Sequence, residues 1–158
     1  MAVRYGLEQD ASGVPYLVAE GAVGEEEILL DSPAAVQRFL DSEYIRLGYQ
    51  AEEHVWMLTT DARKRVKGVF ELAHGTINLA PLSPRMVLSR ALLMGSSAES
   101  VILAHNHPSG DVTPSDQDRE VARRIREAGK LVDVDLIDFV IVGGNDIYSF
   151  NDHGDLDD

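Results

Sequence analysis

Residues 100–128, SVILAHNHPSGDVTPSDQDREVARRIREA, carry the strongest fold signal in the sequence, because they join a strand to an amphipathic helix through a loop rich in proline and glycine. The run from Ser100 to Ala104 is mostly apolar and has the length of a strand, so it predicts a strand buried in a sheet. Residues 108–114 predict a loop. A helix is predicted from about Ser115 to Ala128, with one apolar stripe formed by Val121, Ala122, Ile125 and Ala128.

On both sides of these residues, turn residues and apolar periodicity predict further strands and helices. Two helices should open at Ser32-Pro33, ending near Gly48, and at Ser83-Pro84, ending near Met94. Strands are expected at residues 3–7, 15–19, 54–60, 65–72, 76–79, 136–142 and 147–150. The fold class is therefore mixed α/β (α+β), with a central β-sheet flanked by about three helices.

The composition suits one globular domain, since the chain has 158 residues, of which 44% are hydrophobic. We expect an N-terminal acidic extension with a strand pair at 1–31, the domain itself at 32–151, and an acidic tail at 152–158 that frays. The apolar runs are too short to cross a bilayer, and the first residues lack the order of a secretory signal. These observations predict a cytoplasmic protein without a membrane partner.

Charge and cysteine content restrict the function further. The formal net charge is -13, and most of it lies at the two ends of the chain, so binding to duplex nucleic acid is disfavoured. The chain contains no cysteine, which excludes disulfides, thiolate metal sites and a cysteine nucleophile. A metal site must therefore use imidazole and carboxylate ligands.

A candidate metal site follows the predicted buried strand. His105 and His107 alternate with Asn106, so on an extended backbone both imidazoles point to one side while Asn106 turns away. Asp118 falls on the core side of the following helix, where an unpaired charge would be costly. Catalytic zinc commonly takes three protein ligands and leaves a fourth position for water, so this trio predicts a zinc site.

Each signal also has a structural interpretation. Ser115 and Asp118 match a helix capping box, and a pair of histidines two residues apart is often structural. Other enzymes with this histidine pair fit less well. A metallo-β-lactamase pattern needs Asp and His where Ser109 and Gly110 stand, barrel amidohydrolases need a longer chain, and zinc deaminases need a cysteine pair.

Residues 105–118, HNHPSGDVTPSDQD, resemble the metal motif of the JAB/MPN (JAMM) metalloproteases, in which His-x-His is followed after seven residues by Ser-x-x-Asp. The residues of this motif are most similar to those of the bacterial RadC-like branch of the family. The resemblance extends from about Val55 to Phe150 and includes FELAHGT at 70–76, AGKL at 128–131 and DFVIVG at 138–143.

This resemblance implies a cytidine-deaminase-like JAB/MPN sheet and a zinc-dependent metallopeptidase or isopeptidase. It implies Zn²⁺ held by His105, His107 and Asp118, an oxyanion steadied by Ser115, and Glu71 as the general base for zinc-bound water. Glu71 is assigned by the resemblance alone. The implied substrate is a protein or peptide, with a ubiquitin-like conjugate as one alternative. His74 lies outside the motif, and we expect a surface or structural role for it.

Two other functions stay open at this point. RadC-type proteins are associated with DNA repair, so an accessory protein without peptidase activity is the main alternative, although the acidic charge disfavours nucleic acid and the N-terminal portion lacks the helix-hairpin-helix-like region usual in RadC proteins. A metal-bearing scaffold without catalysis is the third, but such relatives lack ligands that this chain retains. The sequence does not determine the oligomeric state.

Overall fold

The computed structural model describes residues 1–75, 79 and 82–157, and its strands form one seven-stranded mixed sheet. The order across the sheet is β2-β1-β4-β3-β5-β6-β7. The strands are β1 (Ala2–Gln9), β2 (Pro15–Val23), β3 (Glu53–Thr60), β4 (Val66–Gly75), β5 (Ser100–Asn106), β6 (Asp135–Gly143) and β7 (Asp146–Ser149). The α/β fold class predicted from the sequence is confirmed.

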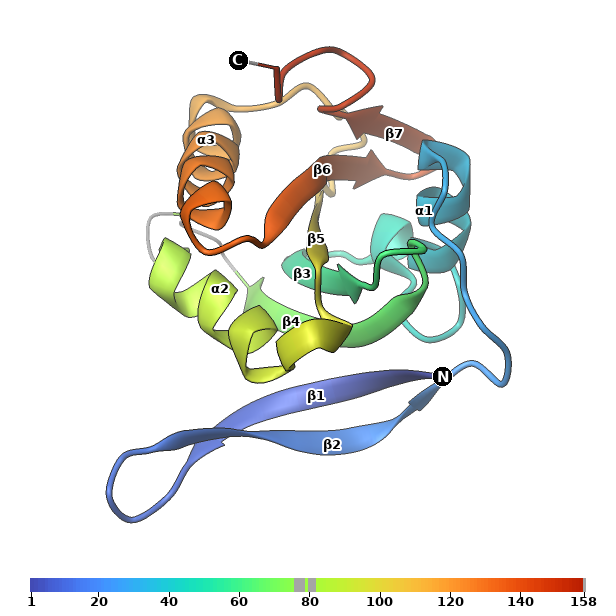
Figure 1. Cartoon of the computed structure of the whole chain (residues 1–158). Helices are drawn as coiled ribbons and strands as arrows, with labels where there is room; N and C mark the ends of the chain where they lie inside the picture. The colour runs from blue at the N-terminus through green and yellow to red at the C-terminus, as the bar shows by residue number, and fades with distance from the viewer. Residues whose placement is uncertain (76–78, 80–81, 158) are drawn as a thin grey trace.

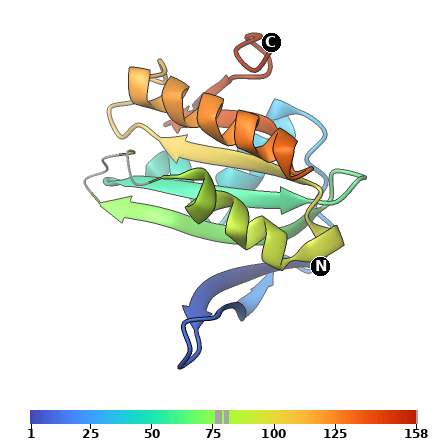
Figure 2. The same cartoon turned by 60° about the vertical axis from the view of Figure 1, so that its left-hand side comes forward.

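Helices cover both faces of the sheet (Figures 1 and 2). Helices α2 (Pro84–Leu93) and α3 (Asp116–Leu131) pack on one face, where Val87 and Ile125 join a core with Met57 and Leu103. We call this the α3 face. Helix α1 (Pro33–Leu40) packs on the other, which we call the α1 face, and its Phe39 joins a second core with Trp56 and Ala104. Successive residues of β3 and β5 thus point to opposite cores.

The three helices begin where the sequence predicts, because each start is preceded by a serine that caps free backbone N–H groups. Ser32, Ser83 and Ser115 each accept a hydrogen bond from the backbone N–H three residues later. Helix α1 ends at Leu40 rather than near Gly48. Arg46 has a φ of 50°, in the left-handed region, and only a short 3₁₀ turn follows, η1 (Leu47–Tyr49).

The acidic C-terminal segment does not fray through Leu156, contrary to the prediction. Leu156 is buried and joins the core on the α3 face. Asp155 accepts a hydrogen bond from the Tyr148 hydroxyl and lies 3.3 Å from the Arg119 guanidinium. One buried apolar side chain and these polar contacts join the segment to the domain.

The N-terminal strand pair is part of the sheet. Strands β1 and β2 form an antiparallel hairpin, and β1 also pairs in parallel with β4 through Val3 opposite Gly68 and Arg4 opposite Val69. The far end of the hairpin projects away from the domain (Figure 1). The strand expected at 76–79 falls largely outside the described residues. Within the described ranges, no helix is long and apolar enough to span a membrane.

Candidate metal centre

Three side chains that are separated in the sequence converge on the α3 face, and together we call them the metal centre: His105, His107 and Asp118. His105 lies near the end of β5, His107 follows this strand, and Asp118 lies in the first turn of α3. His105 Nδ1 lies 3.0 Å from Asp118 Oδ1, and His107 Nε2 lies 3.2 Å from Asp118 Oδ2. The structure thus brings together the three residues that the sequence singled out.

Asp118 is fully buried, yet its carboxylate is held ionised. Burial alone would raise its pKa, but hydrogen bonds from His105, His107 and the backbone N–H of Ser115 hold that pKa well below its ordinary range. The Asp118 N–H in turn donates to Ser115 Oγ at 3.0 Å, which completes a capping box. Capping and metal binding are therefore compatible, as the exposed Ser115 keeps its hydroxyl proton available to a ligand.

The hydrogen bonding of His107 tests whether a cation fits here. A backbone carbonyl can only accept, so His107 Nδ1, which lies 2.8 Å from the Asp111 carbonyl oxygen, must carry a proton. A neutral His107 then directs the lone pair of Nε2 at the Asp118 carboxylate. Protonation relieves this conflict, and hydrogen bonding to Asp118 accordingly raises the pKa of His107. A divalent cation between the two groups would relieve it equally, so the donors fit a metal ion.

His105 supports the same conclusion. Its side chain is almost completely buried, and its Nε2 atom has no hydrogen-bond partner among the described residues. Two imidazoles and one carboxylate are a ligand set that suits zinc and leaves coordination positions open for water and substrate.

The loop between β5 and α3 is fastened to the neighbouring strand. The His107 N–H donates to the Val142 carbonyl at 2.9 Å. Gly110 packs against Gly143, at which an added Cβ would lie only 2.9 Å from the Gly110 Cα atom. Any larger residue at 143 would therefore clash with Gly110 and require the loop that follows His107 to shift.

Asn106, between the two histidines, points away from them as predicted. Its Oδ1 atom accepts from the His54 N–H at 2.6 Å, and its Nδ2 atom donates to the Glu52 carbonyl at 2.9 Å. The buried amide therefore clamps the backbone on both sides of Glu53. This clamp sets the position of Glu53 relative to His105.

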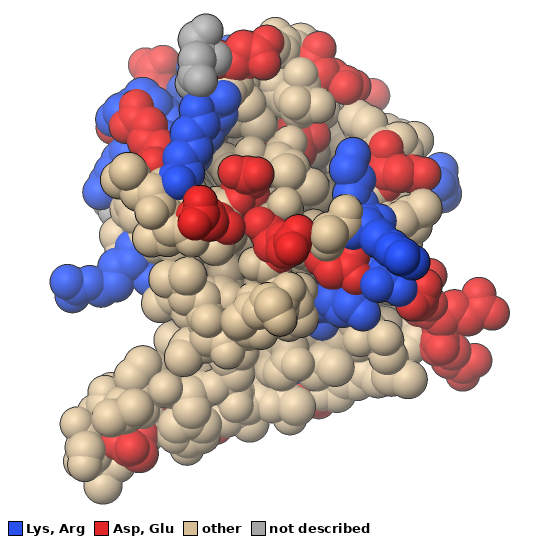
Figure 3. All heavy atoms as spheres, viewed as in Figure 1, with Lys and Arg blue, Asp and Glu red and all other residues tan. Residues whose placement is uncertain are grey.

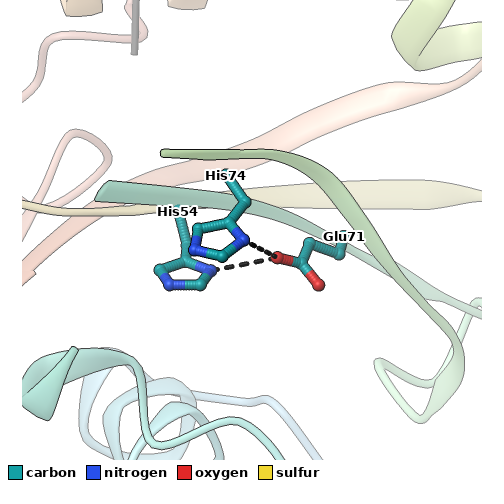
Figure 4. A group of neighbouring side chains, drawn as sticks. All are labelled: His54, Glu71 and His74. Carbon is teal, nitrogen blue, oxygen red and sulfur yellow. Dashed lines mark hydrogen bonds and ion pairs between the residues drawn. The ribbon is translucent and has the colours of Figure 1, made fainter. Parts of the chain in front are cut away.

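The structure does not bring Glu71 to the metal centre, which corrects its assignment as general base. Glu71 lies in β4 opposite Trp56, and Trp56 belongs to the core of the α1 face. Its carboxylate contacts Arg4. It also contacts His54 and His74 (Figure 4). A side chain on that face of a sheet cannot reach a group on the opposite face through the packed strands.

Glu53, and not Glu71, is the glutamate that lies beside the metal centre. Its Oε1 atom lies 3.5 Å from His105 Nε2, and its side chain is 33% exposed, so it faces both the centre and solvent. Alternation along β3 places Glu53, Val55 and Met57 on one face of the strand, and this pattern is present in the sequence. In the structure Val55 pairs directly with His105, which brings Glu53 close to the metal centre. This pairing of β3 with β5 could not be read from either strand alone.

Comparison with known proteins agrees with this architecture. The profile of the RadC-like JAB domain matches residues 30–155. The chain belongs to the RadC-like JAB domain family. This RadC-like JAB domain is 45% identical over 139 residues to a UPF0758 protein of Stenotrophomonas maltophilia (strain K279a), covering 88% of this chain and 56% of that protein.

Other relatives give a similar result. A UPF0758 protein of Burkholderia thailandensis is 44% identical over 131 residues, covering 82% of this chain and 47% of the relative. One of Cupriavidus pinatubonensis is 43% identical over 127 residues, covering 80% and 54%. The RadC-like JAB domain thus spans about half the length of the curated relatives it matches, and their names state no activity.

Proposed function

We propose that this RadC-like JAB domain is a zinc-dependent hydrolase of the metallopeptidase or isopeptidase type. The observation that carries the proposal is the convergence of His105, His107 and Asp118 beside a carboxylate, with the Nε2 lone pair of a neutral His107 directed at Asp118. His105, His107 and Asp118 would hold the ion. When bound, Zn²⁺ supplies Lewis acidity, lowering the pKa of a coordinated water and polarising an amide carbonyl.

Glu53 is proposed as the proton carrier, in place of Glu71. Its partly exposed carboxylate beside His105 can accept a proton from the attacking water and deliver it to the leaving amine. Asn106 holds the Glu53 backbone, so the base keeps its position during both transfers. The Ser115 hydroxyl, at the start of α3, can donate a hydrogen bond to the oxyanion that develops on the substrate.

The proposed substrate is an amide within a protein or peptide, with an isopeptide to a ubiquitin-like protein among the candidates. Two variants with the same chemical change test the assignment of the base. Glu53→Gln should keep its zinc, measured by elemental analysis, while turnover of a panel of peptide and isopeptide substrates falls about 10²- to 10⁴-fold. Glu71→Gln is the matched control and should retain turnover. Unchanged turnover in Glu53→Gln, or a loss confined to Glu71→Gln, would overturn the assignment.

Charge distribution bears on the DNA-associated alternative. On the face shown in Figure 3 basic side chains lie beside acidic ones, and the projecting hairpin is mostly uncharged. Arg123, for instance, forms ion pairs with Glu120 and Glu127. We therefore expect no salt-dependent DNA binding in an anisotropy assay, and strong salt-dependent binding would favour the alternative.

A further inference from the structure

A second group of two histidines and one carboxylate lies on the α1 face of the sheet, and we call it the strand cluster: His54, Glu71 and His74 (Figure 4). His54 Nδ1 lies 3.0 Å from Glu71 Oε1, and His74 Nδ1 lies 4.0 Å from the same oxygen. The two imidazole rings stack, with centroids 4.1 Å apart. Both Nδ1 atoms therefore face a single carboxylate oxygen.

A β-bulge creates this arrangement. His54 and His74 are opposite each other in the antiparallel pair of β3 and β4. Glu71 is three positions before His74, so in a regular strand the two would point to opposite faces. The register shifts between Val55 and Trp56, where one extra residue of β4 is accommodated, and this shift returns Glu71 to the side of His74.

Neighbouring groups hold the carboxylate in a position suited to ligation. Arg4 contacts Glu71 Oε2 at 3.2 Å and lies over the Trp56 ring, which leaves Oε1 turned toward the histidines. Glu71 and His74, together with Arg4 and Glu20, line a hollow on the surface. A hydrated ion can therefore reach the cluster, and a partner such as Arg4 that orients a ligand is common around metal sites.

We propose that the strand cluster is a second metal site, which binds a divalent transition ion such as Zn²⁺, Co²⁺ or Ni²⁺. Two imidazole nitrogens and one carboxylate oxygen match the preferences of these ions, and water completes the coordination. The side chain of His74 is 53% exposed, so its ring can turn to bring Nδ1 in line with His54 and Glu71. The site is separate from the metal centre, since the sheet lies between them, and it does not depend on the proposed hydrolase activity.

The test counts metal ions in the full chain. The protein is stripped with chelator and titrated with Co²⁺, and stoichiometry is measured by calorimetry and by the visible absorption of the bound ion. The wild-type chain should bind two equivalents, the second more weakly. His74→Ala and His107→Ala should each bind one, and the double variant should bind none. His153→Ala is the matched control and should bind two, because His153 stacks on Tyr148 and lies outside both groups.

These variants separate the two sites. One equivalent in His107→Ala that disappears on adding His74→Ala supports the strand cluster even if the hydrolase proposal fails. A wild-type chain that binds a single equivalent, all of which is lost in His107→Ala and none in His74→Ala, would overturn the second site. Glu71→Gln provides an independent variant at the same site, and it should also remove the weaker equivalent while circular dichroism reports an unchanged fold.

Discussion

The metal centre and the strand cluster have the same donor types but differ in how the protein holds them. In the metal centre, the carboxylate of Asp118 is fully buried and comes from a helix that packs over the sheet. In the strand cluster, Glu71 has a side chain that is 26% exposed, and all three residues come from two paired strands. The metal centre lies between helix α3 and the sheet, whereas the strand cluster is built on the sheet alone.

Burial and hydrogen bonding prepare a set of side chains for catalysis. A buried carboxylate with several hydrogen-bond donors stays ionised and in place, and the same burial strengthens its interaction with a cation. A partly exposed cluster is screened by water, and its exposed His74 can turn. We therefore associate the metal centre with chemistry and the strand cluster with weaker, exchangeable metal binding.

The largest effect is expected from removing the buried charge. Asp118→Asn deletes the anion between His105 and His107, so zinc affinity should fall by more than about 100-fold, and activity should fall with it. Competition with a chromophoric chelator measures the affinity. Asp116→Asn is the matched control, since Asp116 lies in the same helical turn but is exposed. Equal zinc affinity in the two variants would contradict the distinction between the two groups.

A smaller effect is expected from the residue that connects the two groups. Asn106 clamps the strand start that carries Glu53 on one face and His54 on the other. Asn106→Ala leaves the His54 N–H and the Glu52 carbonyl without their side-chain partner at a partly buried site, and the loss of the two hydrogen bonds should destabilise the fold by about 1 to 3 kcal/mol in urea unfolding. Zinc should stay bound while turnover drops. Loss of zinc equal to that in His105→Ala would show that Asn106 acts on the ligands instead of on Glu53.

The smallest effect concerns a carboxylate that is buried like Asp118 but faces no imidazole. Asp138 accepts from the Ser149 hydroxyl at 2.6 Å and from the Asn151 N–H at 3.0 Å. Burial outweighs these bonds and raises its pKa above the ordinary value of 3.8. The folded state then binds the proton more tightly than the unfolded state, so Asp138 lowers stability as pH rises from about 3.8 through the raised pKa.

Asp138→Asn should remove this loss. Asn can keep the Oδ1 contact that accepts from the Asn151 N–H, and its Nδ2 can donate to the Ser149 hydroxyl oxygen in place of the bond that Asp138 accepts. The variant should therefore gain stability relative to wild type as pH rises above 4, measured by thermal unfolding over a pH series. No change in the difference between the two proteins across that range would contradict the raised pKa. If Asp138→Asn keeps its zinc affinity while Asp118→Asn loses it, burial alone does not make a carboxylate a metal ligand.

Local sequence determined most of the elements and three of the site residues. Serine caps locate the helix starts, and alternation along β5 places His105 and His107 on one side of Asn106, because these effects act within a few residues. The helical stripe of α3 likewise places Asp118 on the core side. The RadC-like resemblance agrees with the family match, but the base it implied, Glu71, is on the wrong face.

The glutamate that lies beside His105, and the residues that share the opposite face of the sheet, depend on contacts between strands that are distant in sequence. Both outcomes depend on the pairing of β3 with β5 and β4, and on a bulge that changes the face of the sheet to which side chains on one side of it point. Strand register is a property of contacts between distant segments, and a shift of one residue moves every following side chain to the other face. Patterns within a few residues do not encode that shift. The folded sheet is therefore needed to place Glu53 and to group His54, Glu71 and His74.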